Sequence, residues 1–348
     1  MPEILIVSDS LEGGLGQAAL SESAYLLSKS WSVRLTAPRF VQSARTFPEA
    51  YFVSVPIPDA VRDLPGIMRA IRLLRSAWGE SRSPRITHAH GLRSFLVARM
   101  AFIRGSVVVT YHGAAPTSRA RRLALSWIPR FATAAMCVAP IDVKGWEHRW
   151  HWSPFLDTEP VPGLRGRDER SVIPSDPVMV LGWFGRLDHP KRPDIWVEIL
   201  RQAAMAGMTI RGIVIGAGPL EKQIRAAVQS AEVDVEFLGE MGPAEAFSRM
   251  DVLLTWSDSE GVPFTIQEAI WAGIPCLSND LPGPRVLLRS TPGSIVDENN
   301  VIPRLKELTE PAARMELGAS QLEHIAELLA MGKAEVTLER QFGTSQRT

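Results

Sequence analysis

Two glutamates with seven residues between them stand in one stretch, residues 256–279, WSDSEGVPFTIQEAIWAGIPCLSN. Glu260 lies in a loop, and Glu268 lies in the apolar run FTIQEAIWA, which predicts a helix that begins near Phe264. One carboxylate therefore precedes a helix N-terminus and the other lies about one turn inside the helix. The free backbone N–H groups of Phe264 and Thr265 would point the same way as Glu260. This arrangement suits an anionic ligand that also carries hydroxyl groups.

Two cations follow the first strand predicted in the second half of the chain. Arg186 stands at the carboxyl end of a strand over 178–184, and Lys191 stands where the next helix begins. Both could converge above a sheet, where a diphosphate needs its charge neutralised. The alternative is that they form ordinary surface ion pairs. Further along, Gly216 ends another strand in the turn GAGPL, where Pro219 suits the first position of a helix.

Three histidines stand at or near predicted strand ends in the first half. His88 and His90 occur in ITHAHG, and His112 occurs in VVVTYHG. Doubly wound sheets bind ligands at the carboxyl ends of their strands, so these positions favour a role in function. The alternative for each is a satisfied structural histidine. We expect no metal here, because no carboxylate or cysteine cluster accompanies the histidines in the sequence.

A glycine-rich turn follows the first strand. The run EILIVS at residues 3–8 predicts a strand, GGLG contains Gly13 and Gly14, and AALSESAYLLSKS predicts a helix. The spacing is not the dinucleotide fingerprint GxGxxG. The glycines therefore either let a ligand approach closely or only make the turn.

The elements that must position these residues alternate along the chain. The first half predicts strands at 3–8, 32–37, 51–55, 85–89, 106–111 and 134–138, and helices near 61–79, 92–103 and 117–131. The second half predicts strands at 178–184, 210–216, 234–238, 251–256 and 274–278, and helices at 191–205, 219–230 and 243–250. This alternation implies an α/β protein with mainly parallel sheets covered on both faces.

Length and composition favour two domains. The chain has 348 residues, more than one ordinary core accommodates. A segment rich in Pro, Gly and charge, 158–177, is interpreted as a linker between Rossmann-like domains at 1–157 and 178–310, and residues 311–348 follow. Cys137 lies in an apolar strand-like run, as does Cys276 in the other half, so buried thiols are expected rather than a disulfide.

The net charge is zero, but its distribution is uneven. Residues 1–157 hold 19 Lys and Arg against 11 Asp and Glu, net +8, and the rest hold 19 against 27, net −8. One basic helix carries Arg69, Arg72 and Arg75, and Arg119 belongs to a second. The simplest interpretation is a solvated helix face, and the alternative is contact with an anionic membrane or a phosphate-bearing acceptor. Nucleic acid is disfavoured, because aromatic stacking motifs and a basic net charge are both missing.

No signal peptide is expected, because the first residues, MPEILIVSDS, lack a basic region and a long apolar run. Apolar stretches also stay below the roughly 18 residues that span a bilayer. We therefore expect a cytoplasmic protein, with peripheral contact to the inner face of the membrane as the alternative.

Six motifs in order carry a resemblance to a known family. GGLG, TYHG, GRLDHPKRPD, GAGPLEKQIR, FLGEM and SEGVPFTIQEAIWAGIPCLS resemble the retaining nucleotide-sugar glycosyltransferases of family 4. The resemblance covers roughly residues 4–290 and is strongest across 180–280. It implies the GT-B fold, two Rossmann-like domains facing each other across a cleft, with the acceptor side in the first. It also implies that a C-terminal helix within 311–348 crosses back onto the first domain.

The resemblance assigns roles residue by residue. Arg186 and Lys191 match the diphosphate-binding pair, Glu268 matches the glutamate on the ribose hydroxyls, and His112 matches a histidine near the donor sugar. The predicted catalytic residues are His112, Glu260, Arg186 and Lys191. The predicted donor-binding residues are Gly13, Gly14, Arg186, Lys191, Gly216, Met241, Val262, Pro263, Phe264, Thr265 and Glu268. Residues predicted for the acceptor or a membrane are Arg69, Arg72, Arg75, His90 and Arg119.

This sequence departs from the family pattern at two places. Pro263 stands where many relatives have glycine, which stiffens the loop and removes a backbone donor. Pro284 and Arg285 stand where the family often has a second glycine and a nearby glutamate.

The resemblance implies transfer of a sugar with retention, without a metal or other cofactor, from a UDP- or GDP-sugar to a glycan or lipid-linked acceptor in bacterial cell-surface synthesis. A glycosidase with paired carboxylates is disfavoured, because Glu268 lies in a helix and the nearby cations suit a diphosphate leaving group. A GT-B epimerase or phosphorylase and a sugar-nucleotide-binding protein without turnover remain alternatives.

Overall fold

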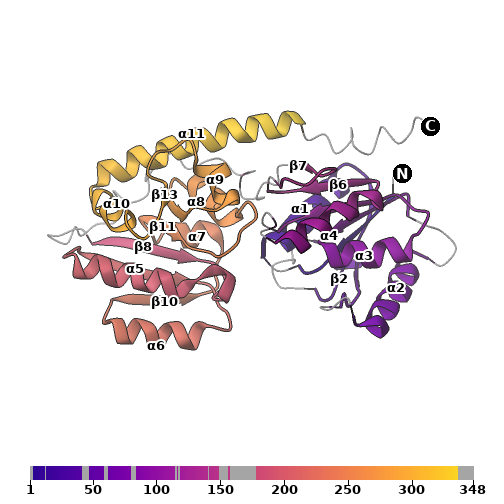
Figure 1. The fold of residues 1–348 in the computed structure, drawn as a ribbon, viewed down its shortest axis with the longest axis horizontal. Helices are drawn as coiled ribbons and strands as arrows, with labels where there is room; N and C mark the ends of the chain where they lie inside the picture. Colours follow the sequence, from indigo (N-terminus) through magenta and orange to yellow (C-terminus); the bar gives the residue numbers. More distant parts are fainter. Residues whose placement is uncertain are drawn as a thin grey trace. The chain divides into compact units, whose positions relative to one another are not determined.

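Figure 1 shows the computed structural model of the chain, which describes residues 3–11, 13–40, 47–58, 62–79, 84–113, 116, 118–139, 141–148, 156 and 178–335. The chain divides into two compact units, Met1–Pro154 and Phe155–Thr348. The expected linker, 158–177, lies outside the described residues. The domain limits inferred from the sequence therefore remain a prediction.

Within the described part of the first unit, a seven-stranded sheet has the order β3-β2-β1-β4-β5-β6-β7, with all neighbours parallel. Its strands are β1 (Glu3–Ser8), β2 (Ser32–Ala37), β3 (Phe52–Ser54), β4 (Ile86–His90), β5 (Val107–Tyr111), β6 (Ala134–Cys137) and β7 (Glu147–His148). The helices are α1 (Gly13–Ser28), α2 (Leu64–Trp78), α3 (Leu92–Ala101) and α4 (Arg119–Trp127), with 3-10 turns η2 (Glu49–Tyr51) and η3 (Ile128–Arg130).

The central strands of this sheet are buried on both faces. Every residue of β4 and β5 is buried, which explains why β5 reads as a continuous apolar run. Strand β4 is the exception in composition, because it buries His88 and His90 as completely as its apolar neighbours. Burial of two imidazoles requires hydrogen-bond partners for both.

Among the described residues of the second unit, a six-stranded sheet has the order β10-β9-β8-β11-β12-β13, again parallel. Its strands are β8 (Met179–Phe184), β9 (Ile210–Ile215), β10 (Val235–Gly239), β11 (Val252–Thr255), β12 (Cys276–Asn279) and β13 (Ile295–Val296). Its helices are η5 (His189–Lys191), α5 (Pro193–Met205), α6 (Glu221–Ala231), α7 (Pro243–Phe247), α8 (Phe264–Trp271), α9 (Pro282–Leu288), α10 (Val301–Glu307) and α11 (Pro311–Glu335). The buried ring of Trp196 on α5 packs edge-on against Trp183 of β8, with ring centroids 6.4 Å apart.

Two helix starts differ from the sequence predictions. Gly13 and Gly14 lie inside the first turn of α1 rather than in a loop before it, because Gly16 allows the helix to begin directly behind β1. A Cβ atom at Gly16 would lie 2.0 Å from the carbonyl carbon of Leu11. Helix α6 begins at Glu221 and not at Pro219, because the preceding Leu220 N–H donates to the carbonyl of Leu187 at 3.0 Å, outside the helix.

Helix α11 packs against α8 and α9 within the second unit. Its buried Gln321 accepts a bond from Cys276 N at 2.8 Å and donates to Cys276 O at 2.8 Å, so one amide satisfies both backbone groups of a strand residue. The segment expected to cross onto the first domain includes residues 336–348, which lie outside the described residues. Cys137 and Cys276 are buried free thiols, as predicted.

Candidate functional site

The switch point of the second sheet lies between β8 and β11. From β8 the strand order runs through β9 to β10, and from β11 it runs through β12 to β13. In open parallel sheets the loops that leave such a pair diverge and form a crevice at the carboxyl edge. Here these loops are residues 185–192, after β8, and 256–263, after β11.

An ion pair and backbone contacts tie the two loops together. Lys191 Nζ donates to Glu260 Oε1, and Ser257 Oγ donates to the same oxygen at 2.9 Å. Asp258 N donates to Pro190 O at 2.9 Å. The Lys191 side chain is 33% exposed and that of Glu260 14%, so the pair is partly accessible. Two predicted site residues from different loops are thus brought into contact.

Two further cations, Arg186 and Arg192, lie at this edge. Arg186 Nε lies 3.3 Å from Asp188 Oδ2, and its side chain is 57% exposed. Arg186 therefore forms an ordinary ion pair, which was the alternative interpretation of its sequence position. Its guanidinium is also accessible to solvent. Arg192, which was not predicted as a site residue, has a left-handed backbone (φ +48°) and pairs with Asp194 at 2.8 Å and Asp258 at 3.1 Å.

Helix α8 begins at Phe264, as predicted, and ends at Trp271. Pro263 is its N-cap residue and makes no side-chain hydrogen bond to the first N–H groups. Val262 and Pro263 are buried, whereas Phe264 and Thr265 are half-buried. The loop can therefore offer backbone N–H groups and the positive end of a helix dipole to an anion. Glu268 is half-buried one turn into the helix.

Two glycines let the loops of this edge approach one another. A Cβ at Gly216, whose φ is +126°, would lie 2.1 Å from Gly185 O. A Cβ at Gly283, at the start of α9, would lie 1.4 Å from Gly261 O. Gly283 was not identified from the sequence. The close contact that requires a glycine there is with a segment more than twenty residues away. Gly216 has a packing role here, and its donor-binding role remains a prediction.

Met241 is half-buried just beyond β10, an edge strand separated from β8 by β9. Its predicted contact with the donor remains a prediction.

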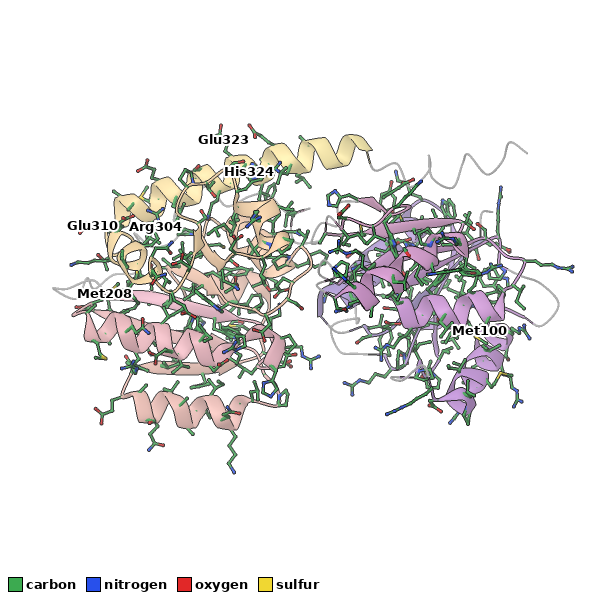
Figure 2. All side chains as sticks on the ribbon, in the orientation of Figure 1. Met100, Met208, Arg304, Glu310, Glu323 and His324 are labelled. Carbon is green, nitrogen blue, oxygen red and sulfur yellow. The ribbon has the colours of Figure 1, made fainter. Side chains whose placement is uncertain are left out.

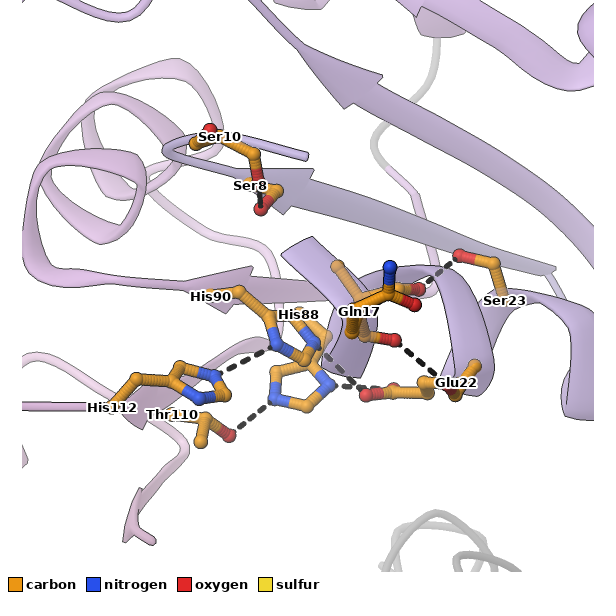
Figure 3. Close-up of polar contacts among 11 residues, drawn as sticks. Ser8, Ser10, Gln17, Glu22, Ser23, His88, His90, Thr110 and His112 are labelled. Carbon is orange, nitrogen blue, oxygen red and sulfur yellow. Dashed lines mark hydrogen bonds and ion pairs between the residues drawn. The ribbon is translucent and has the colours of Figure 1, made fainter. Parts of the chain in front are cut away.

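The corresponding edge of the first sheet carries a buried polar cluster (Figure 3). Glu22 of α1 lies between two histidines of β4, with Oε1 2.6 Å from His88 Nδ1 and Oε2 2.9 Å from His90 Nε2. His90 Nδ1 lies 3.0 Å from His112 Nε2, and His88 Nε2 lies 2.8 Å from Thr110 Oγ1. His112, predicted from the sequence, is thus connected to His90 and through it to Glu22, which was not predicted as a site residue.

The expectation of no metal at these histidines rested on a wrong premise. A carboxylate does accompany them, because α1 places Glu22 so that one ligand atom from each of Glu22, His88 and His90 lies within 4.8 Å of the others. The sequence hid this carboxylate, since 66 residues separate Glu22 from His88.

A second carboxylate overlooked in the sequence, Asp9, follows β1. Its Oδ1 accepts from Ser94 N at 2.6 Å and from Ser94 Oγ at 2.5 Å, which caps the N-terminus of α3 from another strand. Gly91 makes room for it, because a Cβ there would lie 2.2 Å from Asp9 Oδ2. A Cβ placed at Gly13 or Gly14, at the start of α1, would meet nothing within 4 Å among the described residues, so this end of the helix is open to a ligand.

The basic helix α2 carries the three arginines predicted for an acceptor or a membrane. Arg69, Arg72 and Arg75 are all exposed, and Arg75 also donates through Nε to Ala101 O at 2.9 Å and through Nη2 to Met100 O at 3.5 Å, the last carbonyls of α3. Met100 is labelled in Figure 2. Arg75 therefore also stabilises the C-terminus of α3, and the predicted contact of Arg69, Arg72 and Arg75 with an acceptor or a membrane remains a prediction.

Helix α4 presents apolar and basic side chains together. Arg119 is exposed, and so are Leu123 (63%), Trp127 (53%) and, just beyond the helix, Phe131 (56%). Arg130 stacks over the Trp127 ring at 4.8 Å. None of the helices in the described part of the chain has the length and apolar character needed to cross a membrane.

Comparisons with known proteins agree with this geometry. The family model for glycosyl transferases group 1 matches residues 179–309. The O-antigen biosynthesis glycosyltransferase WbnH of Escherichia coli is 31% identical over 101 residues, which cover 29% of this chain and 28% of that protein. The match thus spans less than a third of the relative's length.

Two solved structures show the fold of the whole chain. Sucrose-phosphate synthase from Thermosynechococcus elongatus is similar with a TM-score of 0.79 and 16% identity, over 99% of this chain and 100% of that one. HepE from Anabaena, solved with UDP and glucose, gives a TM-score of 0.71 and 14% identity, over 96% and 98%. The chain therefore has the GT-B fold, and its residues 179–309 match the family model of the group 1 glycosyltransferases.

Proposed function

We propose that this chain is a retaining, metal-independent glycosyltransferase that moves a sugar from a nucleotide diphosphate sugar to a glycan or lipid-linked acceptor in bacterial cell-surface synthesis. The observation that carries the proposal is the Lys191–Glu260 pair, which joins the loops after β8 and β11 at the switch point. The group 1 match over the same residues supports it. The O-antigen role of WbnH supports the acceptor class.

The charges at this edge suit a departing diphosphate. Arg186 and Lys191 supply positive charge, and the start of α8 supplies N–H groups. Fixed donors of this kind act where negative charge develops in the transition state, without covalent participation. Glu260 already holds Lys191, so it orients this cation and lines the sugar side of the loop. Glu268 accepts from the ribose hydroxyls.

Retention in this proposal requires no protein nucleophile. The acceptor oxygen forms its bond to the anomeric carbon on the face that the diphosphate leaves, and a phosphate oxygen takes the acceptor proton. The family resemblance gives His112 the task of positioning the donor sugar. The donor is UDP-linked in the first instance, because HepE was solved with UDP and glucose.

A thermal-shift screen with UDP, GDP, ADP, CDP and their sugar conjugates tests donor binding. A ligand at 100 times its dissociation constant raises the free energy of unfolding by about 2.7 kcal/mol. Glu268→Ala should lose this shift, whereas Glu245→Ala, an exposed control on α7, should keep it. An unchanged shift in Glu268→Ala would contradict the ribose assignment.

Product analysis with a labelled donor tests the reaction. A glycoside of retained configuration is expected, whereas an epimerised sugar nucleotide, a sugar phosphate or no turnover would support the alternatives. Activity should persist in EDTA. Loss of activity that Mn²⁺ restores would contradict the metal-independent mechanism.

We include in the proposal a peripheral attachment to the inner face of the membrane through α4. Its exposed Leu123 and Trp127 offer apolar surface, and Arg119 offers charge for anionic lipid. The double variant Leu123→Ser, Trp127→Ser should lose flotation with vesicles that contain an anionic phospholipid. Arg69→Glu on α2 serves as the comparison, because one charge contributes only about 1 kcal/mol. Absence of flotation by the unmodified chain would rule out this attachment.

A further inference from the structure

A chain of hydrogen bonds runs through the interior of the first unit from His112 to Thr110 (Figure 3). In order, it connects His112, His90, Glu22, His88 and Thr110, with separations of 3.0, 2.9, 2.6 and 2.8 Å. The family resemblance gives a role to His112 but none to the buried carboxylate and the two buried imidazoles behind it.

The side chains at the centre of this chain of hydrogen bonds are buried. His90 is fully buried, His88 is 1% exposed and Glu22 is 8% exposed. Burial acts to raise the pKa of Glu22, but its interactions with His88 and its hydrogen bond with His90 outweigh burial and hold this pKa well below its usual range. Burial, together with nearby His88, lowers the pKa of His90 against the opposing effect of Glu22. Glu22 is therefore a carboxylate and His90 is a neutral imidazole.

The tautomers follow from which groups can donate. A carboxylate can only accept, so His90 carries its proton on Nε2, which faces Glu22 at 2.9 Å. A neutral His90 consequently has a lone pair on Nδ1. His112 must donate from Nε2 to that lone pair across 3.0 Å. The two ring planes are 24° apart and the centroids 5.1 Å apart, as in an edge-to-edge hydrogen-bonded pair.

We propose that Glu22 and His90 are positioning residues for His112, holding its ring in one orientation and in the Nε2-protonated tautomer. This inference rests on the proposed glycosyl transfer, in which His112 positions the donor sugar. No proton leaves the hydrogen-bonded chain during the reaction. Its contribution is orientation, as when a base is held by a third group in a catalytic triad.

The side chains of Glu22, His88 and His90 could instead be metal ligands, and their separations argue against it. Ligands of a tetrahedral zinc ion at about 2.0–2.1 Å lie roughly 3.3 Å from one another. The two contacts of Glu22 are 2.6 and 2.9 Å, which are hydrogen-bond lengths. Elemental analysis of the purified chain decides this point, because a stoichiometric transition metal that Glu22→Gln removes would overturn the proposal.

The first test needs no variant and no activity. Two-dimensional NMR of the chain with ¹⁵N-labelled histidine reports which ring nitrogen carries the proton. His112 is expected to show a protonated Nε2 and an unprotonated Nδ1 at neutral pH, with His90 in the same tautomer. A protonated Nδ1 on His112, or a mixture of tautomers, would overturn the proposal even if Glu22 variants failed to fold.

The second test separates positioning from donor binding. Glu22→Gln keeps the size of the side chain but leaves one acceptor oxygen for two histidines, so His90 must change its bonding. We expect kcat to fall by about 10- to 100-fold, with KM for the donor and Kd for UDP changed less than about twofold. Glu22→Asp, which keeps the charge, should recover part of the loss, and the His112 signals should change in Glu22→Gln.

Ser23→Ala is the matched control. Ser23 is fully buried next to Glu22 on α1 and bonds only within the helix, to Ala19 O at 2.7 Å, among the contacts described for it. It should leave kcat and the NMR signals of His112 unchanged. An equal loss of kcat in Ser23→Ala, or a normal kcat in a folded Glu22→Gln, would overturn the positioning role. If the unmodified chain transferred no sugar, the proposed function would fail while the NMR result still decided the tautomer.

Discussion

The carboxyl edges of the two sheets hold their ionisable groups under opposite conditions. In the first unit, Glu22, His88 and His90 are buried and bonded to one another. In the second, Lys191 and Arg186 remain partly or largely exposed, and each pairs with a carboxylate of a loop rather than of the sheet interior. The first arrangement suits a group that must be held still. The second suits charges that exchange one partner for an incoming diphosphate.

The physical difference lies in solvation. An exposed ion pair contributes little to stability, so breaking it to bind a ligand costs little. A buried carboxylate without its partners costs several kcal/mol, so the Glu22 network resists rearrangement. Each edge can therefore be disturbed separately, and the consequences should differ.

The largest effect is expected from removing Lys191, the cation that joins the two loops at the carboxyl edge of the second sheet. Lys191→Ala should lower kcat/KM for transfer by about 10²- to 10³-fold, or about 3–4 kcal/mol, because charge on the departing diphosphate loses a fixed partner. Steady-state kinetics with the donor found in the thermal-shift screen measures it. Arg201→Ala on α5, which breaks an exposed pair with Glu198, is the control and should change kcat/KM by less than about threefold. Similar losses of kcat/KM in both variants would contradict a specific role of Lys191 at the switch point.

The next effect concerns how closely the loops of the second edge pack. Gly216→Ala should lower the free energy of unfolding by about 2–3 kcal/mol, because the new methyl group meets Gly185 O and the backbone has φ +126°. Gly239→Ala has φ +70° but no atom within 4 Å among the described residues, so it should lose only about 1 kcal/mol. Urea unfolding measures both. Equal losses would show that the positive φ, and not the contact with Gly185 O, determines the cost of replacing these glycines.

Acid should destabilise the first sheet, whose carboxyl edge carries the buried cluster of Glu22, His88 and His90, before it destabilises the second sheet. The folded pKa of His90 lies below its ordinary value, so the unfolded chain takes up this proton first and stability begins to fall as pH drops through about 6.5. The pKa of Glu22 is also lowered, so the stability it contributes is complete above about pH 5 and is lost on further acidification.

Hydrogen exchange read by mass spectrometry from pH 7 to pH 4.5 checks this, with rates corrected for their intrinsic pH dependence. Peptides from β4 should lose protection, and those from β11 should change less. The groups around His90 are Glu22 on α1, His88 on the same strand, His112 after β5 and Asp9 after β1. Equal loss in both sheets would contradict the assignment to this cluster.

The smallest effect tests the open end of α1. Gly14→Ala should leave stability within about 0.5 kcal/mol, because its Cβ meets nothing within 4 Å among the described residues. If a ligand approaches the helix there, kcat/KM should still fall by about tenfold, or 1.4 kcal/mol. Calorimetric unfolding and kinetics are measured on the same preparation. An unchanged kcat/KM would leave Gly14 with a structural role only.

Local sequence predicted much of the second edge. Helix α8 begins at Phe264, as expected, and Arg186, Lys191 and Glu260 fall on the loops that flank the switch point. These positions could be recognised because strand, loop and helix signals lie within a few residues of the chemistry. The hydrogen bonds of Arg75 could not be predicted in the same way, because their acceptors are the carbonyls of a different helix.

By itself, the sequence determined the alternation of strands and helices, the two-domain organisation and the charged loops, because periodicity and turn residues act over short distances. Only the tertiary structure decided that Glu22 contacts His88 and His90, which are 66 and 68 residues away in the sequence. It also decided that position 283 must be a glycine, because the backbone of Gly261 lies where a side chain would be. Burial and hydrogen bonding between distant segments fix the charge and tautomer of a side chain. Those properties are absent from any stretch of sequence read alone.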